Sequence, residues 1–164
     1  MKKFAICFII WLVFQITAHA QSFNLINQKT LGSSFEDNPV SIIQTLDGGY
    51  LVSVSSNGSS NGDKSCMNFG EYDVWICKLN SSLNVEWQNC FGGNSIEMFP
   101  FKIIEGSSGY SLFLSSISGV SGNKTLPYLI EPLTNTPYTH IWVVSLDFNG
   151  NILNQFVYGG EKGA

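Results

Sequence analysis

Four carboxylates stand beside expected strands or turns, and two carboxylates across a cleft are the groups that hydrolyse most glycosidic bonds. Asp47 lies in a turn, where aspartate is common because its side chain bonds the local backbone. Asp73 opens an expected strand, and nothing places Asp37 or Glu97 across a cleft from another carboxylate. A Ser/His/Asp triad would have to use His140, and the Gly-x-Ser-x-Gly turn is absent. We therefore predict no catalytic residue and expect a non-enzymatic protein, although the sequence leaves activity open.

Metal chemistry has weak support in the same residues. The loop 57–63 is rich in the oxygen ligands that Ca²⁺ takes, but it lacks the acidic density and closing glutamate of a calcium loop. We expect a solvated loop there. His140 is the one histidine outside the first 20 residues, which excludes a zinc site built on several histidines. We predict neither a metal nor a cofactor.

Three cysteines lie beyond the first 20 residues, at Cys66, Cys77 and Cys90. An odd number allows at most one internal disulfide and leaves a thiol, and there is no C-x-x-C spacing. If Leu79 faces Val85 across a hairpin, Cys77 and Cys90 point to opposite faces of the sheet, because side chains alternate along a strand. We therefore predict that Cys77 and Cys90 are not bonded to each other.

The start of the chain has the three zones of an export signal. Two lysines precede an apolar run over residues 4–16, and Ala-His-Ala at 18–20 offers the small residues of a cleavage site. The run is shorter than the roughly 20 apolar residues of a spanning helix. We predict cleavage before Gln21, no transmembrane segment, and a protein that is secreted, held at the cell surface or periplasmic.

The charge balance limits the partners. Without the expected signal peptide, six lysines stand against twelve acidic residues, so the net charge is −6, and the chain contains no arginine. Nucleic-acid binding needs a basic face that neutralises phosphates, so we predict no nucleic-acid partner. Arginine forks for carboxylate or phosphate ligands are missing as well.

The chain repeats itself in units of about 60 residues. Trp75 aligns with Trp142, and we expect both to pack between units rather than to stack on sugars, since they lie in mid-strand. Gln88 aligns with Gln155, and an earlier match puts Gln28 at the same position. Each unit has four runs of β-branched and aromatic residues that predict strands. They span residues 40–45, 50–55, 73–79 and 85–91 in the first unit, and 101–105, 110–116, 140–146 and 152–158 in the second.

This pattern predicts an all-β fold of four-stranded antiparallel β-propeller-like blades. Two units with a lone N-terminal strand make an incomplete propeller, and a small β-sandwich is the alternative. The expected boundaries are a signal peptide over 1–20, a lone strand over 21–31 that matches the fourth strand of a blade, repeats over 32–91 and 92–158, and the stub of a third repeat over 159–164.

The two units resemble the repeats of large secreted β-propeller proteins from Bacteroidetes-type bacteria. The resemblance rests on Ser-Ile-Ile-Gln-Thr-Leu-Asp-Gly-Gly-Tyr at 41–50, Asp-Val-Trp-Ile-Cys-Lys-Leu-Asn at 73–80, and Trp-Gln at 87–88 with Phe-Gly-Gly at 91–93. It implies blades rather than an activity. Many members of this group end in a type IX secretion sorting domain, which this sequence lacks, and it has fewer units than a closed ring needs.

We therefore expect a secreted, non-enzymatic propeller-type repeat module, a fragment of a longer array, that acts in extracellular binding or as a scaffold. The rival interpretation is part of a secreted carbohydrate-active hydrolase or lyase on a propeller frame. The ligand is unknown, with a glycan or a protein as the two classes considered, and the loop over 118–138 is expected to carry specificity. Two units leave sheet faces and edges open, so we also expect self-association or packing against further blades, or else marginal stability.

Overall fold

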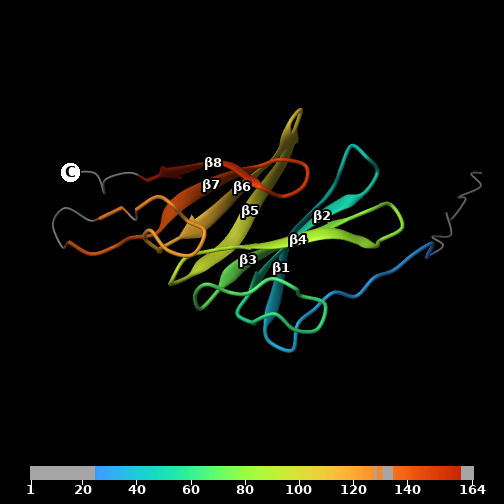
Figure 1. Cartoon of the computed structure of the whole chain (residues 1–164), viewed down its shortest axis with the longest axis horizontal. Helices are drawn as coiled ribbons and strands as arrows, with labels where there is room; N and C mark the ends of the chain where they lie inside the picture. Colours follow the sequence, from blue (N-terminus) through green and yellow to red (C-terminus); the bar gives the residue numbers. More distant parts are fainter. Residues whose placement is uncertain (1–24, 128, 131–134, 160–164) are drawn as a thin grey trace, which may run out of the picture.

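The computed structural model describes residues 25–127, 129–130 and 135–159. The expected signal peptide, its cleavage site and all but the first residue of the expected stub lie outside these ranges. The described chain is all-β, and its strands form two four-stranded antiparallel sheets that lie as separate layers (Figure 1). Within the described residues, no helix is long and apolar enough to cross a membrane.

Each sheet is one repeat unit, with its strands in sequence order. The first sheet has the order β1-β2-β3-β4 and the second β5-β6-β7-β8, so neighbouring strands are hairpin partners throughout. The predicted β runs are confirmed: all eight are strands, and the structure lengthens mainly the first strand of each unit. The bounds are β1 Asp37–Gln44, β2 Tyr50–Ser56, β3 Asp73–Leu79, β4 Val85–Phe91, β5 Glu97–Gly106, β6 Gly109–Ser116, β7 His140–Leu146 and β8 Ile152–Tyr158.

Short turns join the strands at one end of each sheet. Gly48 has φ of 81° between β1 and β2, and Gly150 has φ of 82° between β7 and β8. These left-handed conformations are ones that glycine adopts without steric cost, as the turn chemistry of the sequence indicates. The long connections, β2 to β3 and β6 to β7, lie at the other end of the sheets. The sheets thus have a turn end and a loop end.

The two sheets pack through faces that are not equivalent. In the first sheet, Val74 and Ile76 face the shared core, whereas Trp75 lies on the opposite face. In the second sheet, Trp142, the repeat counterpart of Trp75, is the side chain that faces the shared core. Strand β5 lies against β1, β2 and β3, as Figure 1 shows. The units are therefore stacked head to tail, with one face of the first unit on the opposite face of the second.

The register of the β3–β4 hairpin corrects one step of the sequence reasoning. Leu79 pairs with Val85, as assumed, but a bulge follows at Lys78/Leu79, so Cys77 pairs with Gln88. The bulge adds one residue and reverses the face of every later residue of β4. Cys77 and Cys90 therefore point to the same face, and the reason given for their not bonding is wrong. The predicted outcome is nevertheless confirmed, because Cys90 is bonded to Cys66 and Cys77 is free.

The lone N-terminal strand expected over residues 21–31 is not present as a strand over its described part, 25–31. A strand needs a ladder partner, and none of the eight strands pairs with this segment. Leu31 instead packs on the outer face of the first sheet, beside Trp75. The two sheets also form no closed ring within the described residues, so the incomplete propeller remains a hypothesis.

Candidate functional site

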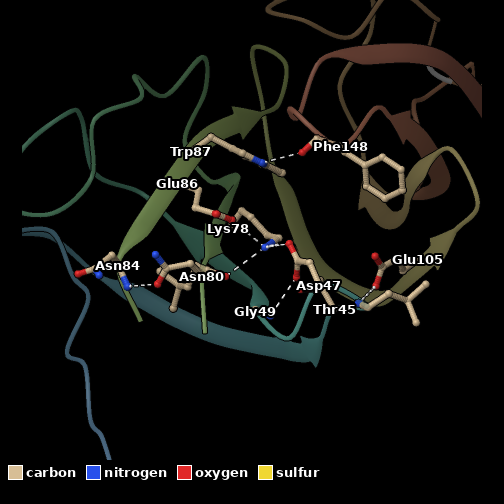
Figure 2. Close-up of polar contacts among 12 residues, drawn as sticks. Thr45, Asp47, Gly49, Lys78, Asn80, Asn84, Glu86, Trp87, Glu105 and Phe148 are labelled. Atoms are coloured by element: carbon tan, nitrogen blue, oxygen red, sulfur yellow. Dashed lines mark hydrogen bonds and ion pairs between the residues drawn. The ribbon is translucent and has the colours of Figure 1, made fainter. Parts of the chain in front are cut away.

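A cavity of about 640 Å³ opens between the two sheets at their turn end. We call it the turn cavity. Three aromatic rings, three carboxylates and one ammonium gather around it, and Figure 2 shows most of them. Its lining residues are Leu46, Asp47, Lys78, Glu86, Trp87, Glu105, Tyr110, Phe148 and Asn149.

Cross-strand pairing explains why these side chains meet. Lys78 of β3 is paired with Trp87 of β4, and Glu105 of β5 is paired with Tyr110 of β6. Directly opposite residues in an antiparallel pair share a face. Both pairs face the space between the sheets, at the point where the apolar core ends. Phe148, in the β7–β8 turn, completes the wall: its carbonyl oxygen accepts a hydrogen bond of 2.9 Å from the Trp87 indole.

Lys78 is the electrostatic centre of the turn cavity. Its ammonium forms ion pairs of 2.8 Å with Asp47 and 2.8 Å with Glu86, while its side chain is 3% exposed. Burial alone would lower the pKa of Lys78, but hydrogen bonds to the two carboxylates outweigh it and raise the pKa. The hydrogen bond from Lys78 also holds the pKa of Asp47 far below its usual range, with further bonds from Thr45 and Gly49.

The aromatic residues form a connected group. The Trp87 and Tyr110 ring centroids lie 6.2 Å apart, and the Tyr110 and Phe148 rings meet edge to face at 5.5 Å. Burial, together with the charges of Glu105, Asp47 and Glu86, raises the pKa of Tyr110 against the effect of Lys78. The Tyr110 phenol therefore stays protonated at neutral pH, as a neutral polar group among charged ones.

Of the carboxylates considered from the sequence, three lie far from the turn cavity. Asp37, Asp73 and Glu97 are the first residues of β1, β3 and β5, at the loop end. A seven-residue strand separates that end from Asp47 by about 20 Å. The Asp73 and Glu97 side chains are fully buried. The structure thus brings Asp73 and Glu97 near each other, but not in a cleft that a substrate enters.

At the loop end, burial is the main cause of the pKa shifts of Asp73 and His140. It raises the pKa of Asp73 to about 7 against a hydrogen bond from the Phe69 backbone, and the charge of Glu97 adds to the rise. His140, the repeat counterpart of Asp73, is also buried, and burial lowers its pKa. Its Nδ1 lies 3.1 Å from the Tyr138 carbonyl oxygen. Neither Asp73 nor His140 lines the turn cavity.

Two buried lysines organise the long loops. The ammonium of Lys64 donates to Ser56 Oγ at 3.0 Å, and the loop 57–63 bends round it. Lys124 takes the same place in the second unit and donates to the Ser118 carbonyl at 2.6 Å. Both side chains are almost fully buried. The loop 57–63 is therefore built around an internal cation, which composition did not indicate.

The aligned glutamines anchor the same loops. Gln88 Oε1 accepts the Trp75 indole N–H at 2.8 Å, and Gln155 Oε1 accepts the Trp142 indole N–H at 3.1 Å. Each glutamine amide then donates to a carbonyl of its own loop, at 2.9 Å in both units. Both tryptophans are buried, but Trp142 alone packs between the sheets, while Trp75 lies on the outer face beside Cys90. Gln28 has no such role.

The remaining predicted features lie apart from the turn cavity. Residues 128 and 131–134 of the loop 118–138 are outside the described ranges, and its described part lies at the loop end. Among the described residues, no group of three or more His, Cys, Asp or Glu is placed to hold a metal ion. Sequence reasoning named Asp47 but missed Lys78, Trp87 and Glu105. The signal available was their common place at strand ends next to short turns.

Comparison of the chain with known protein families, curated protein sequences and solved structures finds no match. The described residues by themselves show an all-β protein of two four-stranded antiparallel sheets.

Proposed function

We propose that the chain is a secreted, non-enzymatic binding module built from β-propeller-type blades, and that the turn cavity is its ligand site. The turn cavity carries the proposal: about 640 Å³ of open space, lined by aromatic rings and by charged groups held in place by hydrogen bonds. Ligand sites are concave, with apolar walls and a few placed polar groups. The disulfide between Cys66 and Cys90 is consistent with an oxidising compartment outside the cytoplasm.

Binding is favoured over glycoside hydrolysis by the state of the carboxylates. A glycosidase needs one carboxyl with a raised pKa to protonate the leaving group. In the turn cavity, the pKa of Asp47 is lowered instead, and Glu86 is tied to Lys78. Among the described residues, the carboxyl with a clearly raised pKa is that of Asp73, which is buried at the opposite end of the sheets. A secreted carbohydrate-active hydrolase or lyase remains the second candidate.

The blade interpretation is supported by the head-to-tail packing. A sandwich formed by two copies of one sheet around a two-fold axis would use the same face twice, whereas these units use opposite faces. The face of the second sheet that corresponds to the first sheet's core face is open. The exposed Lys102 lies on it opposite Phe113, together with five large apolar side chains. They are Phe101, Phe113, Ile141, Phe156 and Tyr158. We propose that this open face packs against a further blade or a second copy.

The binding proposal is tested by a glycan and peptide array set against a panel of polysaccharide hydrolysis assays. We expect retention of a ligand without turnover. Phe148→Ala should weaken retention at least about fivefold, because it removes a ring from the wall of the turn cavity. Phe35→Ala is the matched control, since Phe35 is similarly exposed and lies outside the turn cavity. Hydrolysis that is lost in Glu105→Gln would favour the hydrolase instead.

The open-face proposal is tested by analytical ultracentrifugation over a dilution series. We expect oligomers that dissociate on dilution, and Phe156→Lys should shift the chain to monomer because it places a charge on the apolar face. Phe35→Lys, away from that face, should leave the oligomers unchanged. A dilution-independent monomer with a sharp thermal transition would argue for a closed sandwich.

A further inference from the structure

The charges of the turn cavity do not balance. Asp47, Glu86 and Glu105 stand against Lys78, so the lining carries a net charge of −2. An ammonium has three N–H donors. The Lys78 ammonium directs its hydrogen bonds to Asp47, to Glu86 and, at 3.2 Å, to the Leu79 carbonyl. Lys78 therefore has no donor left for a ligand.

Acceptors remain on the opposite wall. Glu105 Oε2 accepts the Leu46 backbone N–H at 2.9 Å (Figure 2), and within the described residues Glu105 has no cationic partner. Tyr110, paired with Glu105 across β5 and β6, is 2% exposed. No described residue forms a hydrogen bond with the Tyr110 hydroxyl. Tyr110 lines the same cavity as Glu105.

The aromatic rings beside these acceptors also favour a cationic ligand with a carbon chain. Trp87, Tyr110 and Phe148 surround the space that Glu105 faces. The face of an aromatic ring attracts a cation, and its apolar area packs against a carbon chain. The indole N–H of Trp87 is already donated to the Phe148 carbonyl, so it offers no hydrogen bond to an anion.

We propose that the turn cavity binds the primary ammonium group of an aliphatic amine. Glu105 and the Tyr110 hydroxyl accept its N–H bonds, and the rings of Trp87 and Phe148 pack against its carbon chain. An anionic ligand is repelled by the net negative charge, and a neutral polyol finds acceptors but few free donors. This inference rests on the proposed function, because it names the ligand class of the same site.

The test titrates the purified chain by calorimetry with 1,5-diaminopentane and with 1,5-pentanediol, which has the same length and no charge. We expect the diamine to bind at least about tenfold more tightly than the diol, and its affinity to fall as salt screens the charges. 1,5-Bis(trimethylammonio)pentane, which keeps both charges but has no N–H, should bind more weakly than the diamine.

Two substitutions locate the binding. Glu105→Gln keeps the shape and removes the charge, and should weaken the diamine about fivefold or more. Tyr110→Phe should weaken it less, since one hydroxyl is lost. Glu71→Gln, an exposed carboxylate outside the turn cavity, is the control and should bind as the unaltered chain does. Circular dichroism and thermal melts check that each variant is folded.

Equal binding of diol and diamine, no binding of the diamine, or unchanged binding in Glu105→Gln would overturn the ammonium inference. The proposed function fails separately. It fails if neither amines nor any array ligand is retained and Phe148→Ala changes nothing. If the ammonium inference is wrong, the proposed function still holds when a neutral ligand is retained and Phe148→Ala weakens the retention of that ligand.

Discussion

Replacing Asp73 by asparagine should remove a pH dependence of folding stability between about pH 4 and pH 7. Burial raises the pKa of Asp73 from 3.8 to about 7. Within this range the folded chain holds a proton on the carboxyl, and the unfolded chain has released it. The stability that this protonated carboxyl contributes is therefore fully present below pH 3.8 and is lost as the pH rises towards 7. Each pH unit costs about 1.4 kcal/mol, so the whole window costs about 4 kcal/mol.

The assay is urea unfolding followed by tryptophan fluorescence from pH 4 to pH 8, for the unaltered chain and for Asp73→Asn. The informative quantity is the difference in unfolding free energy between the two at each pH. His140, whose stability contribution is lost as the pH falls below 6.5, is present in both chains and cancels. We expect the variant to gain about 4 kcal/mol relative to the unaltered chain across the window. For Glu71→Gln, the difference in unfolding free energy from the unaltered chain should not change with pH. A flat or falling difference for Asp73→Asn would refute the argument.

Two further predictions concern the loop anchors. Cys66→Ser opens a disulfide that spans 24 residues and should cost about 3.5 kcal/mol of unfolding free energy in urea, by the loop-closure entropy of the unfolded chain. Cys77→Ala, at the free cysteine, should cost clearly less, and equal losses would contradict this role of the disulfide. Gln88→Ala and Gln155→Ala should each cost about 1–3 kcal/mol, since each leaves a buried indole N–H without its acceptor. A loss in one unit and none in the other would show that the two anchors are not equivalent.

Strand positions could be predicted because they depend on local patterns. β-branched and aromatic runs between glycine turns place all eight strands, and the repeat places one unit on the other. The register of β3 and β4 could not be predicted in the same way. The bulge at Lys78/Leu79 changes no residue type, yet it moves Cys90 to the face of Trp75. An equivalent bulge at Ser145/Leu146 shows that the feature belongs to both units.

The candidate site was harder to predict than the fold. The turn cavity joins residues as distant in sequence as Asp47 and Phe148, which meet because two sheets stack with their turn ends together. Each side chain alone has an ordinary explanation, such as turn chemistry for Asp47. The internal cations Lys64 and Lys124 were also missed. A lysine in a polar loop is usually solvated, and nothing in the composition indicates that carbonyl and hydroxyl oxygens enclose its ammonium.

The two units share several loop anchors and differ at the turn cavity, and the difference at the turn cavity bears on function. The lysine and the glutamine that hold a unit's own loop are of the same type in both units, as with Gln88 and Gln155, whereas the Cys66–Cys90 disulfide is found in the first unit.

At the turn cavity, by contrast, the two units carry different residues at equivalent positions. In the second unit, Ser145 is the counterpart of Lys78, and Asn154 is the counterpart of Trp87. Glu105 likewise has a glutamine, Gln44, as its counterpart in the first unit. The repeat frame needs none of these groups, since the other unit forms the same sheet without them. Lys78, Trp87 and Glu105 are therefore additions to the frame, whereas Tyr110 has Tyr50 as its counterpart in the first unit. Such additions are expected where a repeat protein binds a ligand rather than where it packs its own core.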